Sequence, residues 1–129
     1  MGTGTKLSKA NAPHAASMPG FEGRYAREDG YNLGFESFEA AVDFTPMYRG
    51  LPDDLCQSHH WGYVIKGRMI FHRPEGEIVA EEGEAYYVGP GHTGEIGLPG
   101  TEVVEFSPLE EYDRTMAVVA KNLEAAGGA

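Results

Sequence analysis

The stretch from Cys56 to Gly67 begins with polar residues and runs into a β-branched pair, Val64 and Ile65, and a turn glycine. Because successive side chains of a strand point to opposite faces, this stretch predicts two distinct faces. One face carries Cys56, Ser58, His60, Gly62 and Val64. The other face carries Gln57, His59, Trp61, Tyr63 and Ile65. A thiol, a hydroxyl and an imidazole in one row are typical of transition-metal sites. The second face is largely apolar, so we expect the N-terminal segment, a C-terminal helix or a second subunit to cover it.

Short strands separated by turns continue the pattern after Gly67. The predicted strands are 68–73, 77–81, 85–88, 92–98 and 101–106, and 40–44 is the clearest strand before Cys56. Glycine or proline lies between them, as in Pro74-Glu75-Gly76 and Gly89-Pro90-Gly91. Strands that recur about every ten residues with such turns indicate an antiparallel sandwich or a small barrel.

The hydrophobic period then changes to that of a helix. Ser107-Pro108-Leu109-Glu110 offers an N-cap serine, a proline at the first helical position and a glutamate three residues after the cap. Apolar residues follow at helical spacing, namely Leu109, Tyr112, Met116, Val119 and Leu123, and Gly127-Gly128 ends the run. We therefore expect a flexible arm over residues 1–20, a barrel over 21–107, and a helix over 108–126 that packs on the barrel or on a partner subunit.

Composition and charge narrow the classes of partner. The 129 residues include 18 glycines and 8 prolines, which suits many tight turns better than a helical bundle. The formal net charge of -10 opposes binding to nucleic acid or to an anionic membrane surface. A single cysteine excludes an internal disulfide, and no apolar run reaches the roughly 20 residues that span a bilayer. We expect a soluble, cytoplasmic protein.

Over residues 38–107 this arrangement of strands and turns resembles the cupin family. In the first cupin motif two histidines, a glutamate and a glycine recur at set spacings. With Gly67 at the glycine position, His60 falls on the glutamate, Cys56 on the second histidine and Asp54 on the first. In the second motif Gly83 and Gly91 match, whereas Gly89 replaces the proline and Gly94 replaces the histidine. His92 lies two residues before that histidine position, on the same face of the strand.

The resemblance implies an all-β fold, a cupin-type double-stranded β-helix or jelly-roll barrel with one C-terminal α-helix. It also implies that His60 and His92 point into one lumen. With Cys56 as a thiolate or Asp54 as a carboxylate, they would bind a divalent transition metal such as Zn, Fe or Ni. A metal-dependent enzyme of the dioxygenase, isomerase or lyase type would act there on a small polar molecule. The alternative is a non-catalytic cupin that binds or senses a small ligand without metal. The apolar outer face favours a homodimer.

Each candidate ligand also has a purely structural interpretation. His60 would be a hydrogen-bonded histidine in the lumen, and His92 would close the turn after Gly91. Cys56 would be a small buried hydrophobic residue. Asp54 would cap backbone amides in the Pro-Asp-Asp turn.

Overall fold

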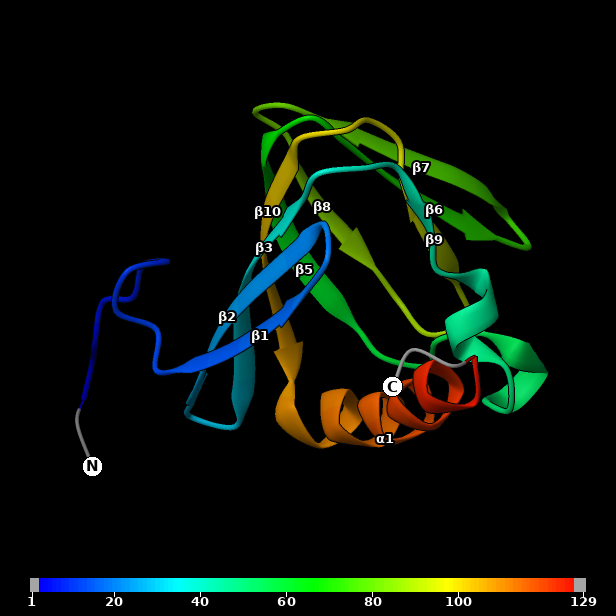
Figure 1. Cartoon of the computed structure of the whole chain (residues 1–129), viewed down its shortest axis with the longest axis horizontal. Coiled ribbons are helices and arrows are strands. Elements are labelled where there is room, and N and C mark those ends of the chain that lie inside the picture. The colour runs from blue at the N-terminus through cyan, green and yellow to red at the C-terminus, as the bar shows by residue number, and fades with distance from the viewer. Residues whose placement is uncertain (1–2, 127–129) are drawn as a thin grey trace.

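The structure is a computed structural model that describes residues 3–126 (Figure 1). It contains ten strands: β1 (His14–Met18), β2 (Phe21–Glu28), β3 (Tyr31–Phe38), β4 (Val42–Asp43), β5 (His60–Lys66), β6 (Arg68–Arg73), β7 (Gly76–Glu81), β8 (Ala85–Val88), β9 (Thr93–Ile96) and β10 (Thr101–Pro108). Two 3-10 helices, η1 (Thr45–Tyr48) and η2 (Pro52–Asp54), precede β5, and one α-helix, α1 (Leu109–Ala125), follows β10. The glycines expected to end this helix, Gly127 and Gly128, lie outside the described residues.

The strands form two antiparallel sheets that face each other. The larger sheet has the order β1-β2-β3-β10-β5-β8, and the smaller has the order β4-β9-β6-β7. In Figure 1 helix α1 lies across one end of the space between the sheets, close to η1. The prediction of an all-β barrel with one C-terminal helix is confirmed. Within residues 3–126, no helix has both the length and the apolar character needed to cross a membrane.

Several element boundaries differ from those predicted from the sequence. β6 and β8 span the expected residues, whereas β4 covers only two residues of the predicted strand 40–44. β1 pairs antiparallel with β2 along its whole length. Residues His14–Met18 therefore belong to the large sheet, although we had expected a loose arm there. The pairing gives backbone groups of this polar segment hydrogen-bond partners that sequence composition does not reveal.

The start of α1 corrects a second expectation. Ser107 is the seventh residue of β10, and the N-cap position belongs to Pro108, which has no side-chain capping bond. The hydroxyl of Ser107 is instead hydrogen-bonded to the ring of His60 at 2.6 Å. A serine two residues before the helix thus supports a buried histidine rather than the helix terminus, because the strand turns its side chain toward the interior.

The hydrophobic core fills the space between the two sheets. Phe38, Val64 and Val103 from the larger sheet pack with Phe71 and Ile96 from the smaller one. Burying one such side chain contributes roughly 1.5–3 kcal/mol, so this contact holds the sheets together. The predicted alternation along β5 is confirmed, because His60 and Val64 are buried while the residues between them on the other face are exposed.

The outer face of the larger sheet is apolar and uncovered. Trp61, Tyr63 and Ile65 are each between 42% and 44% exposed. Their neighbours on this outer face add further exposed aromatic side chains, Tyr87 from β8 and Phe106 from β10. Of the three covers expected from the sequence, neither α1 nor the N-terminal segment 3–20 buries these residues.

Candidate metal centre

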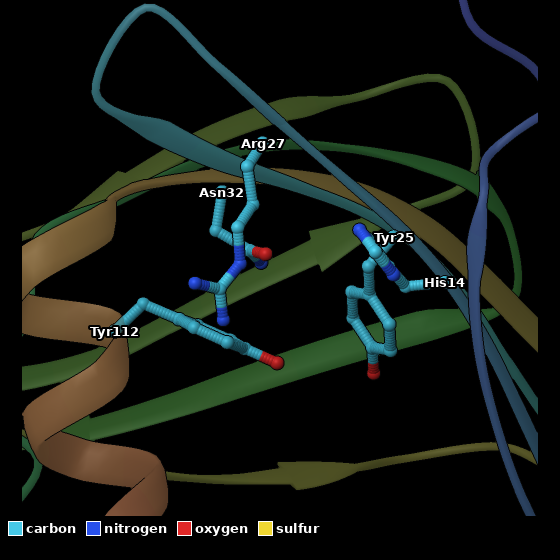
Figure 2. Close-up of a pocket in the computed structure, with 5 residues that line it drawn as sticks. All are labelled: His14, Tyr25, Arg27, Asn32 and Tyr112. Atoms are coloured by element: carbon cyan, nitrogen blue, oxygen red, sulfur yellow. The ribbon is translucent and has the colours of Figure 1, made fainter.

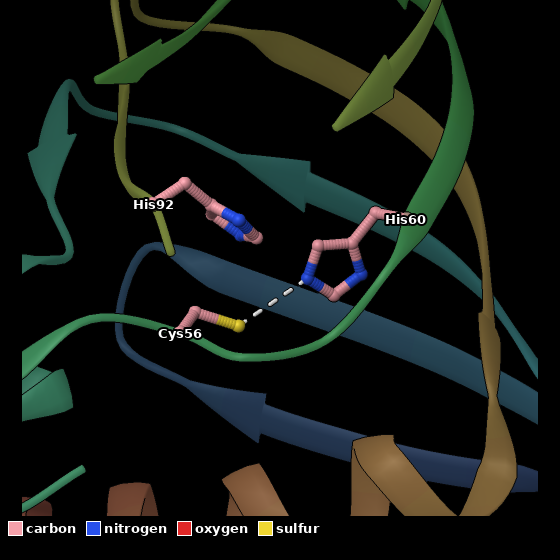
Figure 3. Close-up of side chains that lie close together, drawn as sticks. All are labelled: Cys56, His60 and His92. Atoms are coloured by element: carbon pink, nitrogen blue, oxygen red, sulfur yellow. Dashed lines mark hydrogen bonds between the residues drawn. The ribbon is translucent and has the colours of Figure 1, made fainter. Parts of the chain in front are cut away.

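Three of the predicted metal-ligating side chains come together inside the barrel. One ligand atom each from Cys56, His60 and His92 lies within 4.8 Å of the others. The Cys56 Sγ atom is 3.5 Å from Nε2 of His60, and the centroids of the two imidazole rings are 5.1 Å apart. All three residues are buried. Figure 3 shows the thiol and the two rings pointing toward one another, Cys56 and His60 from one stretch of chain and His92 from another.

Backbone pairing explains why residues 36 positions apart meet here. Cys56 and His92 form an isolated antiparallel bridge, in which the Cys56 amide donates to the His92 carbonyl at 2.7 Å. The Gly91 amide donates to the Cys56 carbonyl at 2.8 Å. His60 is the first residue of β5, where it pairs with Val88 of β8. The bridge and the strand pairing together place the three side chains around one small volume.

Hydrogen bonds to Nδ1 orient both histidines. His92 Nδ1 donates to the Gly89 carbonyl at 2.7 Å, so the proton of this neutral ring lies on Nδ1 and Nε2 carries a free lone pair. That Nε2 atom is buried and has no hydrogen-bond partner within residues 3–126. His60 Nδ1 lies 2.6 Å from the Ser107 hydroxyl and 3.3 Å from Oε1 of Glu105. Both rings therefore present Nε2 to the centre, as metal-bound histidines do when a second group holds Nδ1.

Burial keeps all three side chains uncharged at neutral pH. It lowers the pKa of His60 and of His92 to about 4, and the neighbouring His60 adds to the effect on His92. It raises the pKa of the Cys56 thiol to about 11. The imidazoles are thus already in the neutral form that binds metal, whereas the thiol would release its proton on binding.

Asp54, the fourth predicted ligand, lies outside this group. Its carboxylate accepts a hydrogen bond from the Gly50 amide at 2.9 Å, within the turn around η2. Its backbone has a positive φ of 59°, a conformation that aspartate tolerates better than most residues. The turn-capping interpretation of Asp54 accounts for both observations.

A row of residues across the inner face of the large sheet escaped the sequence analysis. Glu105 of β10 lies between Gly34 of β3 and Gly62 of β5, and these glycines are paired in turn with Tyr25 of β2 and Tyr86 of β8. The missing side chains of the two glycines leave room for the tyrosine rings, which lie over their backbones. The alternation along β10 places Glu105 on the same face as Val103 and Ser107. A glutamate on the inward face of a strand could therefore have been recognised from the sequence as a candidate functional residue.

Two carboxyl groups on this inner face have tyrosine partners, namely Glu105 in the row and Glu36, which lies two residues from Gly34 on β3. The Tyr86 hydroxyl donates to Glu105, and the Tyr25 hydroxyl donates to Glu36 at 2.6 Å. The pKa of each glutamate is raised from 4.5 to about 7, by burial in both cases and, for Glu36, also by the charge of Glu105. The inner face beside His60 therefore holds carboxyl groups that exchange protons near neutral pH, a property common at functional sites.

The donor set fits a transition metal. A thiolate and two imidazoles suit zinc, iron or nickel, and three protein ligands leave a coordination position open to a small molecule. The buried, unpartnered Nε2 of His92 is the kind of atom that a ligand is expected to satisfy. Two close sheets with polar side chains directed between them define a small β-barrel with an interior site.

Comparison with known proteins identifies the barrel at the level of the fold. No protein-family model matches the chain, and no curated protein matches it. Solved structures do match. An ethanolamine utilization protein Q (EutQ) from Salmonella typhimurium has a TM-score of 0.52 and 11% identity, over 74% of this chain and 79% of that one. Ectoine synthase from P. lautus has a TM-score of 0.54 and 10% identity, over 81% of this chain and 77% of that one.

A variant of oxalate decarboxylase from B. subtilis gives a TM-score of 0.56 and 16% identity. The match covers 84% of this chain and 30% of the decarboxylase. These proteins have the cupin fold, and the chain shares that fold, as expected from the sequence. Identities this low show the fold alone.

Proposed function

We propose that this chain is a small cupin that binds a divalent transition metal through Cys56 Sγ, His60 Nε2 and His92 Nε2 and acts on a small polar molecule there. The observation that carries the proposal is the convergence of three buried ligand atoms within 4.8 Å. The hydrogen bonds at both Nδ1 atoms support it, because they leave Nε2 of each ring free for the centre.

Zinc, iron or nickel bound in this way would supply a Lewis acid or activate water or dioxygen. The residues of the chain would do the remaining work. Ser107 holds the His60 ring in position, and Glu105 lies close enough to accept or return a proton beside it. Ectoine synthase and oxalate decarboxylase show by their names that this fold is used by enzymes, although a shared fold does not name the reaction.

Elemental analysis of protein purified without added metal or chelator tests the proposal. We expect a stoichiometric transition metal that is lost in His60→Ala and in His92→Ala. His59→Ala is the matched control, because His59 is the neighbour of His60 but its ring contacts Glu111 on the other side of the strand. Loading with Co²⁺ provides a second measurement, since a thiolate-to-cobalt absorption band should disappear in Cys56→Ser.

A different result would favour the non-catalytic alternative. Metal-free protein that is fully folded, and whose stability does not respond to Zn²⁺, Fe²⁺ or Ni²⁺, would contradict the metal proposal. The barrel would then be a site that binds or senses a small ligand without metal.

We also propose that the protein is a homodimer in the cytoplasm. The exposed apolar side chains around Trp61 form a continuous outer face on β5, β8 and β10. Two copies of one sheet face are self-complementary about a twofold axis, which would remove these side chains from water. The single cysteine is a free, buried thiol, which suits a reducing compartment.

A further inference from the structure

A pocket lies on the inner face of the large sheet where β1, β2 and β3 approach α1. Its volume is about 380 Å³, at the small end of the range for ligand sites. The lining residues are His14, Tyr25, Arg27, Asn32 and Tyr112. Figure 2 shows the Arg27 guanidinium and the Asn32 amide side by side, with the Tyr112 ring facing them from α1. The pocket contains none of the proposed metal ligands.

The polar groups of this pocket are mainly hydrogen-bond donors. Asn32 is only 4% exposed as a residue, and its side chain lines the pocket. The Arg27 guanidinium carries five N–H donors and uses one nitrogen in an ion pair with Asp113 at 3.1 Å. Its remaining donors are available to the pocket.

The two tyrosines supply apolar walls and one further donor. Their ring centroids are 6.2 Å apart, with the rings tilted by 46°. The hydroxyl of Tyr25 already donates to Glu36, so it adds no donor to the pocket. The hydroxyl of Tyr112 is protonated at neutral pH and can donate, and burial raises its pKa to about 12.

We propose that this pocket binds the carboxylate of a small organic acid that has an apolar body. The Arg27 guanidinium, the Asn32 amide and the Tyr112 hydroxyl would receive the carboxylate, and the two tyrosine rings would contact the body of the molecule. A monoanion fits better than a phosphate dianion, because one guanidinium faces the pocket and Asp113 lies beside it. The net charge of -10 further disfavours a dianion.

Titration of benzoate into the full-length protein tests this proposal. The titration is done by calorimetry in the presence of a metal chelator, so that its outcome is independent of the proposed metal function. We expect binding with a dissociation constant of about 1 mM or tighter, and a shift of the Asn32 side-chain amide signals in ¹⁵N NMR spectra. Benzyl alcohol, the uncharged analogue, should bind at least about tenfold more weakly, because a hydrogen-bonded charge is lost.

Two variants and one control locate the site. Arg27→Gln should weaken benzoate binding by about tenfold or more, and it changes a side chain that is half exposed, so the fold should be retained. Asn32→Leu keeps the volume of the buried amide and should have a similar effect. Arg73→Gln changes an arginine of the other sheet, whose side chain donates to the Gly76 carbonyl, and should leave binding unchanged.

Four results would overturn the proposal. They are no benzoate binding, equal binding of benzyl alcohol, tighter binding of inorganic phosphate than of benzoate, and an equal loss of binding in Arg73→Gln. None of them bears on the metal centre, which is tested by metal content.

Discussion

The aromatic ring of Tyr86 lies directly over the backbone of Gly62 on the inner face of the large sheet. A Cβ atom at Gly62 would overlap this ring. Because glycine lacks that atom, the Tyr86 hydroxyl reaches Glu105, whose carboxyl group is in turn 3.3 Å from Nδ1 of His60. One absent side chain thus lets a tyrosine hydroxyl reach the carboxyl group that lies beside a candidate metal ligand.

Gly62→Ala should therefore destabilise the fold. The added methyl group must displace the Tyr86 ring in a packed interior, which costs about 1–3 kcal/mol. Urea denaturation followed by fluorescence measures the change in the free energy of unfolding. Gly4→Ala is the control, because a Cβ atom at Gly4 has no neighbour within 4 Å. Equal stability of the two variants would show that the ring is not held against Gly62.

Ser107→Ala should weaken metal binding without removing a ligand. Loss of the hydrogen bond to His60 Nδ1 frees the ring to rotate, and loss of such a supporting group typically costs 10–100-fold in metal affinity, about 1.4–2.7 kcal/mol. Competition with a chromophoric chelator measures the affinity. Ser37→Ala is a matched control, since the buried Ser37 hydroxyl has no partner within residues 3–126. An unchanged affinity in Ser107→Ala would mean that this serine does not orient the histidine.

The stability of the protein should depend on the protonation of Glu36. Its pKa is raised from 4.5 to about 7 by burial, so the folded state keeps a proton that the unfolded chain releases. Its contribution to stability is complete below pH 4.5 and is lost as the pH rises through about 7. The side chain of Glu36→Gln is neutral at every pH. As the pH rises from 4.5 to about 7, the free energy of unfolding of this variant should increase by on the order of 1–3 kcal/mol relative to that of the unmodified protein.

Denaturation of both proteins at about pH 5 and about pH 8 measures this difference. The comparison of variants is needed because His60 and His92 act in the opposite direction. Their lowered pKa values stabilise the fold above pH 6.5, and that contribution is lost as the pH falls toward about 4. Glu82→Gln, an exposed control, should show no such pH-dependent difference. A constant difference between Glu36→Gln and the unmodified protein would contradict the prediction.

Trp61→Glu should convert the proposed dimer into a monomer. A charge at the centre of the apolar outer face would be buried without a partner in the interface, which costs several kcal/mol. Sedimentation velocity measures the mass in solution. Val79→Glu introduces the same charge at an exposed valine of the smaller sheet and should leave the mass unchanged. An unaltered dimer in Trp61→Glu would place any interface elsewhere.

Sequence reasoning succeeded where the information is local. The turn residues predicted the strands on either side of them, and the alternation along β5 correctly assigned His60 to the buried face and Trp61 to the exposed one. It was wrong for Ser107 as an N-cap, and it did not reveal that Asp54 lies apart from the other three candidate ligands. Each of those residues has two chemically reasonable partners, and the choice between them depends on distant segments of the chain.

The amino-acid sequence alone determined the class of fold and the side of the strand on which each candidate ligand lies, because both follow from spacing and periodicity between neighbouring residues. Only the tertiary structure decided that His92 pairs with Cys56, and that Tyr25, Glu105 and Tyr86 lie in one row across four strand pairings. Such contacts depend on strand order and register, and these are set by how the two sheets bury their apolar faces against each other.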